Sequence, residues 1–181
     1  MTGEICLNKK LLILFTLTVS LITLLSSASA DARELYDGRY LIRPIDSRLV
    51  VTASWLPNKT YGKNSKVMIF HNENNRNWRH WRIIGIGGDQ FKILWRDTNL
   101  ALDIAEGRAQ NGTPVIIWPY HGGSNQRWRI YEMENGGYSF INVGTGLALD
   151  LPGDNRTPRT RYHGYEENGT RAQIFQIIRL R

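Results

Sequence analysis

The chain has 181 residues, of which 41% are hydrophobic and 22% are charged, and it carries a formal net charge of +7 at pH 7. This balance is typical of a globular protein, and it excludes an intrinsically disordered chain and a polytopic membrane protein. The length alone allows one domain or two.

The first thirty residues have the layout of a secretory signal peptide. Residues 11–25 carry no charge, are largely apolar and directly follow Lys9 and Lys10. Ala28 and Ala30 provide the small residues that signal peptidase accepts. An uncleaved membrane anchor is the alternative, but this stretch is short against the roughly 20 residues needed to span a bilayer. We therefore expect a signal peptide over 1–30, a secreted, extracellular chain without membrane insertion, and a short tail at 31–37.

The mature chain is expected to be moderately basic and free of cysteine. Removal of residues 1–30 takes away Glu4, Lys9 and Lys10, which lowers the net charge to +6, and it also takes away Cys6, the only cysteine. An exported domain of this size must then be stabilised by core packing instead of disulfides. Thiol catalysis and cysteine-ligated zinc are excluded, and we expect no cofactor and no metal.

Three similar units follow one another along the mature chain. Each ends in a short motif centred on an aromatic residue, and these residues, Trp81, Trp128 and Phe175, are spaced by 47 and 47 positions. A second motif, Leu-Ala-Leu-Asp, places Asp103 and Asp150 the same 47 positions apart. Because the aromatic residues stand in apolar alternations, we expect them to fill the centre of the domain.

The units are predicted to consist of short β-strands. Each begins with glycine and an aromatic residue, continues with alternating apolar and polar residues, and is punctuated by Gly, Asn, Asp and Pro. No ten-residue stretch of helical periodicity follows Ala30. One unit of about 47 residues cannot bury an apolar face alone, so we expect a single all-β domain with threefold closure. The expected repeats are 38–84, 85–135 and 136–181.

The motifs of the second unit resemble those of the ricin B-type lectin family, whose domains contain three QxW repeats. They are Leu100-Ala101-Leu102-Asp103, Asn111-Gly112-Thr113 and Asn125-Gln126-Arg127-Trp128. The match runs from Gly38 to Leu180 and is best in the second unit, moderate in the third and poor in the first. The resemblance implies a β-trefoil over 38–181 that binds glycans, possible galactose-type ones included, on cell surfaces or polysaccharides.

The second unit contains the best candidate sugar site. The resemblance implies that Asp103 accepts hydrogen bonds from sugar hydroxyls and that Trp118 stacks on the sugar ring. The alternatives are that this aspartate caps its own turn and that this tryptophan packs in the core. Where many relatives have a glutamine, this chain has Ile116, which reduces the supply of hydrogen bonds. The remaining candidates are Asn125 to pair with a hydroxyl, Gln126 to steady the aspartate, and His121 as an extra contact.

The third unit contains a second candidate site, formed by Asp150, Tyr162 and Gln173. Either Tyr162 or Tyr165 can supply the stacking ring. The favoured gap placement pairs Tyr162 with Trp118 and leaves His163 and Tyr165 at the rim. In the first unit Thr52 replaces the aspartate and Arg79 the glutamine, so we expect that unit to be scaffold.

An enzyme is the first competing interpretation, since two carboxylates about 5–10 Å apart can hydrolyse glycosides. Asp103 and Asp150 occupy equivalent positions in different units, however, so threefold closure separates them. No serine-hydrolase, zinc-protease or phosphate-binding motif is present. We therefore expect no catalytic residues.

Two other interpretations concern partners. Residues 75–82 and 156–161 are basic, which favours polyanions. Export argues against nucleic acid but leaves sulfated glycans as ligands. The small secreted domain also resembles, in size and layout, the targeting subunits of secreted toxins, so other toxin subunits are candidate partners.

Overall fold

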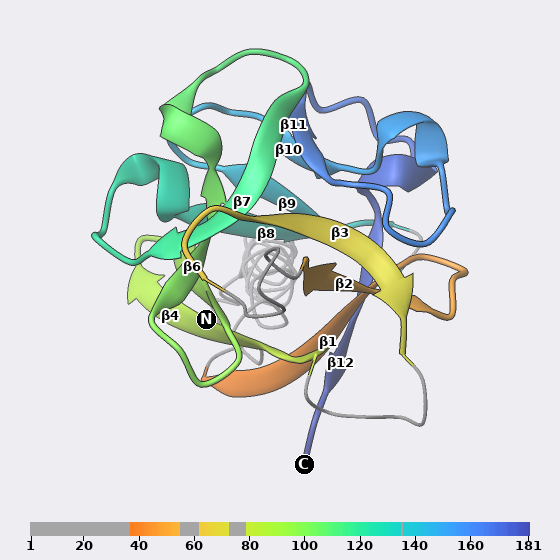
Figure 1. Ribbon diagram of the computed structural model, residues 1–181, viewed down its shortest axis with the longest axis horizontal. Helices are drawn as coiled ribbons and strands as arrows, with labels where there is room; N and C mark the ends of the chain where they lie inside the picture. The colour runs from red at the N-terminus through yellow and green to blue at the C-terminus, as the bar shows by residue number, and fades with distance from the viewer. Residues whose placement is uncertain (1–36, 55–61, 73–78, 135) are drawn as a thin grey trace, which may run out of the picture. The chain divides into compact units, whose positions relative to one another are not determined.

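The computed structural model describes residues 37–54, 62–72, 79–134 and 136–181 (Figure 1). The expected signal peptide and all of the expected tail except Asp37 lie outside these residues, and both stay predictions. Within the described residues the chain forms strands and single turns of 3₁₀ helix. The strands are β1 (Gly38–Pro44), β2 (Leu49–Ala53), β3 (Ser65–His71), β4 (Trp81–Gly87), β5 (Gln90–Trp95), β6 (Leu100–Ile104), β7 (Thr113–Pro119), β8 (Trp128–Glu132), β9 (Tyr138–Asn142), β10 (Ala148–Asp150), β11 (His163–Tyr165) and β12 (Phe175–Arg179).

Six of the strands pair in a closed antiparallel ring. The pairs run from β1 to β4, β5, β8, β9, β12 and back to β1. The other six strands form the hairpins β2–β3, β6–β7 and β10–β11. Each repeat thus supplies two ring strands and one hairpin, which is the β-trefoil arrangement. The prediction of an all-β fold with threefold closure is confirmed.

The three hairpins also pair with one another. Strand β7 of the second repeat pairs with β3 of the first and with β11 of the third. The backbone N–H of Tyr162 donates to Val67 O at 2.9 Å, which connects the third repeat to β3. Because these contacts cross repeat boundaries, each hairpin shares its edge with a neighbouring repeat.

The recurring aromatic residues occupy the core, as predicted. Trp81, Trp128 and Phe175 are each 0% exposed. The indole N–H of Trp81 donates to Val51 O at 2.9 Å, and that of Trp128 donates to Leu102 O at 3.0 Å. Each indole therefore fixes the hairpin of its own repeat to the ring beneath it, whereas the phenylalanine of the third repeat has no such donor.

No helix among the described residues is long and apolar enough to cross a membrane.

Candidate functional site

Asp103 and Trp118 project from the same face of the β6–β7 hairpin. Asp103 is directly opposite Ile116, and Ala101 is directly opposite Trp118. Directly opposite residues, and residues two apart along a strand, share a face of the sheet. The aspartate is 2% exposed, while the tryptophan is only partly buried. The alternative that Trp118 packs in the core is therefore wrong.

Two side-chain amides hold the carboxylate of Asp103. Gln126 Nε2 donates to Oδ2 at 2.8 Å, and Asn125 Nδ2 donates to both oxygens at 3.1 Å. A carboxylate has about four acceptor positions, so these bonds leave acceptor capacity on Oδ1. Gln126 lies where it was expected, beside the aspartate. The amide nitrogen of Asn125, which was expected to serve a sugar hydroxyl, is directed at Asp103 instead.

The turn η5 (Ser124–Gln126) brings both amides to the carboxylate. Asn142, at the end of β9, donates its amide hydrogens to Asn125 O at 2.8 Å and to Arg127 O at 3.2 Å. Gln126 Nε2 also donates to Pro119 O, and its Oε1 accepts the backbone N–H of His121 at 2.8 Å. These bonds fix the turn from both sides, so the amides are held in place before any ligand binds.

Burial raises the pKa of the Asp103 carboxyl above its ordinary value. Hydrogen bonds from Gln126 and Asn125, and the charge of nearby His121, act in the opposite direction but more weakly. A buried carboxylate with spare acceptor capacity favours a ligand that donates hydrogen bonds.

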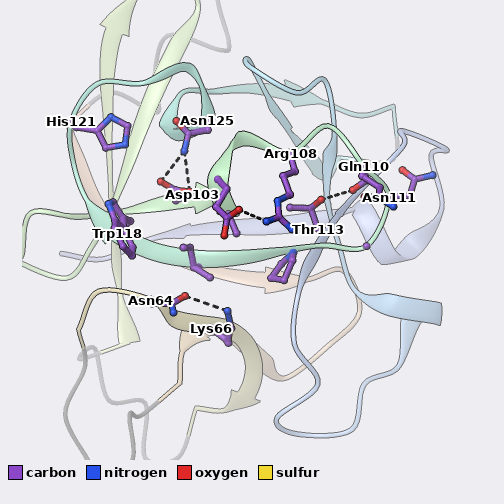
Figure 2. A pocket seen from close by; sticks show the side chains of 15 residues that line it. Asn64, Lys66, Asp103, Arg108, Gln110, Asn111, Thr113, Trp118, His121 and Asn125 are labelled. Carbon is purple, nitrogen blue, oxygen red and sulfur yellow. Dashed lines mark hydrogen bonds and ion pairs between the residues drawn. The ribbon is translucent and has the colours of Figure 1, made fainter.

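A pocket of about 660 Å³ opens over this carboxylate (Figure 2). Trp118, His121, Asn125 and Asp103 lie toward one end, and Arg108, Gln110 and Asn111 toward the other. The pocket follows β7 over its whole length. The backbone N–H of Gly123 donates to His121 Nδ1 at 3.2 Å, which orients the histidine expected at the rim.

Three residues of the first repeat also belong to this region, and sequence reasoning missed them. Asn64 and Lys66 line the pocket, and Lys63 Nζ lies 4.8 Å from the centroid of the Trp118 ring. No comparison of one unit with another reveals them, because they arrive through the pairing of β3 with β7.

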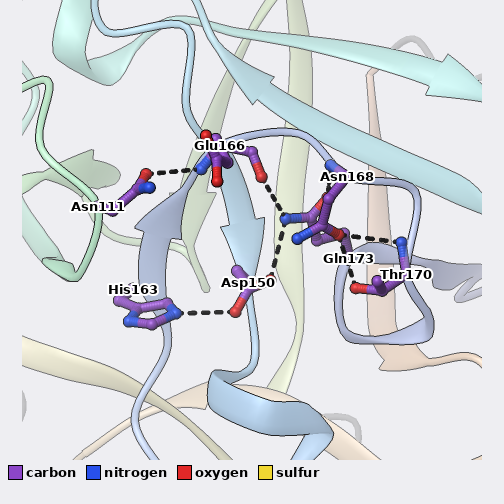
Figure 3. A network of polar contacts seen from close by, with 7 residues as sticks. All are labelled: Asn111, Asp150, His163, Glu166, Asn168, Thr170 and Gln173. Carbon is purple, nitrogen blue, oxygen red and sulfur yellow. Dashed lines mark hydrogen bonds and ion pairs between the residues drawn. The ribbon is translucent and has the colours of Figure 1, made fainter.

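The third repeat forms a related arrangement around Asp150 (Figure 3). Gln173 Nε2 donates to Asp150 Oδ2 at 3.0 Å, and His163 Nε2 lies 2.8 Å from Asp150 Oδ1. Asp150 is 5% exposed and Gln173 1%. A second pocket opens beside Asp150, His163 and Tyr165.

Tyr162 cannot be the stacking ring of this second site. It is 1% exposed, and its ring packs in the core 5.9 Å from that of Phe175. Asp150 is opposite His163 and Ala148 is opposite Tyr165, so Tyr165 occupies the position of Trp118. The gap placement was the error, because the constant offset of 47 positions leads from Trp118 directly to Tyr165.

The first repeat has a different arrangement at the equivalent place. Thr52 lies opposite Met68, and Val50 lies opposite Phe70. The Arg79 guanidinium carbon is 4.6 Å from the Phe70 ring centroid, much as Lys63 lies over the Trp118 ring, so the missing carboxylate at Thr52 is what distinguishes this repeat. This geometry agrees with the expectation that the first repeat is scaffold.

Of the basic stretch 156–161, Arg156 is held by the fold, whereas Arg159 and Arg161 are exposed. Arg156 Nη1 donates to Ile45 O at 2.6 Å and its Nε to Asp154 Oδ1 at 2.9 Å, while the Arg159 guanidinium lies 5.8 Å from the Phe70 ring. The first half of the other basic stretch, residues 75–78, lies outside the described residues, whereas Arg79, His80 and Arg82 are described. Among the described residues, no cluster of three acidic, histidine or cysteine side chains could hold a metal ion.

Comparison with known proteins shows where this fold recurs. A family model described as a ricin-type β-trefoil lectin domain-like family matches residues 32–118 and 124–181. The designed threefold-symmetric protein ThreeFoil superposes with a TM-score of 0.72 at 24% identity, over 80% of this chain and 100% of that chain. A ricin B-like lectin from Macrolepiota procera, solved in complex with lactose, gives a TM-score of 0.63 at 20% identity, over 80% and 97%.

One curated relative is similar over a shorter stretch. The main hemagglutinin component type C of Clostridium botulinum C phage is 42% identical over 55 residues, which make up 29% of this chain and 19% of that protein. The matched stretch thus spans about a fifth of the hemagglutinin. The family model, by contrast, covers most of this chain and every residue that lines the two pockets except His121, so the chain belongs to the family of ricin-type β-trefoil lectin-like domains.

Proposed function

We propose that this protein is a secreted module that binds glycans without altering them, with its main site around Asp103. One observation carries the proposal: a buried carboxylate, held by two amides, keeps acceptor capacity beside a partly exposed tryptophan. Vicinal hydroxyls of a sugar donate to such an acceptor, while the less polar face of the sugar lies on the indole. The family and its lactose-bound member support the same function.

The surroundings of the two aspartates support binding without catalysis. Asp103 and Asp150 belong to different repeats and different pockets. The second carboxylate of the larger pocket, Glu106, is paired with Arg108. Neither arrangement presents the free acid and base that glycoside hydrolysis requires.

A glycan array probed with residues 31–181 at low and high salt tests the proposal. We expect binding to a defined set of glycans and displacement by the free sugar that they share, galactose being the first to try. A single site of this kind is expected to be weak, with a dissociation constant near the millimolar range, equivalent to about 4 kcal/mol. Absence of binding to every glycan, or hydrolysis of one of them, would contradict it.

Trp118→Ala is expected to weaken glycan binding by about tenfold or more, because the sugar loses its apolar contact. Since the side chain is only partly buried, the free energy of unfolding should change by about 1 kcal/mol or less. Titration calorimetry and thermal unfolding of the same variant check both parts. A loss of stability without a loss of affinity would show that the ring is structural.

Binding at the main pocket should be lost on acidification before the domain unfolds. Protonation removes the charge of Asp103 and part of its capacity to accept hydrogen bonds. Because the pKa of this carboxyl is raised, the change occurs above about pH 3.9, the pKa of an ordinary aspartate. When the pKa of a carboxyl is higher in the folded than in the unfolded state, the free energy of unfolding increases as the pH falls through the folded-state pKa. When affinity and circular dichroism are measured from about pH 7.5 to about pH 4, affinity should therefore be lost at a higher pH than the circular dichroism signal of the folded domain. A constant affinity down to the unfolding transition would contradict this.

A second candidate function is that of a cell-binding component of a larger assembly, which the similarity to a hemagglutinin component favours. Two pockets on one domain allow cross-linking of cell-surface glycans. Agglutination of erythrocytes by residues 31–181, and its loss in Asp150→Ala, would support this role.

A further inference from the structure

The main pocket contains a cation at a fixed distance from its acid. Asp103 is opposite Ile116 in the β6–β7 pair, and Ile116 is opposite Lys66 in the β7–β3 pair. The three residues thus form one row across three strands and share a face. Two strand spacings separate the Cα atoms of the acid and the lysine by about 10 Å. Among the described residues no ion pair joins the lysine to the carboxylate, and both line the same pocket, so the lysine is placed to contact a ligand bound beside the carboxylate.

A second lysine adds to this charge. Lys63 Nζ lies 4.8 Å from the centroid of the Trp118 ring, and Lys66 Nζ donates to Asn64 Oδ1 at 3.2 Å. Within the described residues neither ammonium forms an ion pair with a carboxylate. On the opposite side of the pocket, Glu106 and Arg108 neutralise each other. The wall formed by β3 therefore carries the excess positive charge.

The other two repeats differ at the equivalent position. In the third repeat the row is Asp150, His163 and Pro114, so an uncharged residue replaces the lysine. In the first repeat the row is Thr52, Met68 and Arg161, so the cation is present and the acid is missing. Of the three repeats, the second alone combines a carboxylate acceptor with a lysine across the row.

We propose that the main pocket selects glycans that carry a carboxylate or a sulfate. A neutral sugar donates its hydroxyls to Asp103 and lies against Trp118, and the acidic group of the same or the adjacent sugar contacts Lys66 and Lys63. This selectivity rests on the proposed glycan-binding function and specifies the ligand class of the same site. The pocket beside Asp150 lacks this lysine, and the basic residues that line it, His163 and Arg171, are paired with Asp150 and Asp46.

An array of matched glycans tests this selectivity: lactose and N-acetyllactosamine, each in neutral form, with sialic acid, and with sulfate on galactose. The Asp150→Ala variant of residues 31–181 isolates the main pocket. We expect the acidic members to bind about five- to tenfold more tightly than the neutral ones, and the advantage to shrink as salt is raised. If the sialylated members bind most tightly, the preferred acidic group is a carboxylate. If the sulfated members bind most tightly, it is a sulfate.

Lys63→Gln combined with Lys66→Gln should remove the preference and keep the affinity for neutral members. Lys92→Gln is the matched control, because Lys92 Nζ lies 4.9 Å from the Tyr120 ring centroid, outside the residues that line the pocket. Equal binding of neutral and acidic members, or a preference that survives the double substitution, would overturn the acidic selectivity and leave the glycan-binding function intact. Failure to bind any member would overturn the acidic selectivity, and absence of binding across the full glycan array would overturn the proposed function as well.

Discussion

Asp103→Ala is expected to lower the affinity of the main pocket for its glycan by about a hundredfold or more. A hydrogen bond to a charged acceptor contributes about 1.5–3 kcal/mol, and the carboxylate serves the sugar hydroxyls directly. The fold should remain, because the two amides keep other acceptors: Gln126 Nε2 donates to Pro119 O at 3.1 Å and Asn125 Nδ2 to Ile104 O at 3.4 Å. The substitution also removes the cost of burying the charge.

The measurement is titration calorimetry in the Asp150→Ala background, so that the second pocket does not mask the loss. Asp97→Ala is a suitable control, since it removes the same charge from an aspartate whose side chain is 60% exposed and paired with Arg39. Unchanged affinity in the double variant, with the control also unchanged, would show that Asp103 only holds the amides of Asn125 and Gln126.

Trp128→Ala is expected to destabilise the domain by about 3–5 kcal/mol, the largest loss of stability that we expect from one substitution. The side chain is 0% exposed, and its indole N–H holds Leu102 O, one residue before Asp103. A domain of this size has a total stability of about 5–15 kcal/mol, so the variant will be marginal.

Trp128→Phe gives a milder test of the same contact. It removes the indole donor and keeps an aromatic ring, as the third repeat does with Phe175, and should cost about 1–3 kcal/mol. Urea denaturation measures both variants, and Trp118→Ala serves as the same substitution at a partly exposed position. A loss below about 1 kcal/mol in Trp128→Ala would show that the core tolerates the cavity.

The fold could be predicted because each repeat carries the same spacing. Trp81, Trp128 and Phe175 lie where an invariant period of 47 places them, and the alternation of apolar residues suffices to identify strands. The pairing of Asp103 with Gln126 was expected from the resemblance to the lectin family, and not from the period. The Tyr162 prediction failed because the third unit was aligned to the second with a gap that it does not need. The gap paired Trp118 with the core residue Tyr162 instead of the rim residue Tyr165.

The remaining features depend on contacts between repeats, which no periodicity encodes. Lys66 reaches the main pocket only through the β3–β7 pair, in which it lies opposite Ile116. The role of Arg156 is similar, since its carbonyl partner, Ile45, lies 111 positions away along the chain. The basic composition of 156–161 suggested a surface for polyanions, whereas this arginine connects two repeats.

The pairing of the three hairpins with one another has a consequence for how such domains diversify. The main pocket is assembled from two half-sites: the second repeat provides the acceptor and the ring, and the first repeat provides the facing wall with Asn64 and Lys66. A repeat transplanted into another trefoil would keep its acid and acquire the host's wall. Its ligand preference would then follow the host, so specificity can change without mutation of the residues that define the motif.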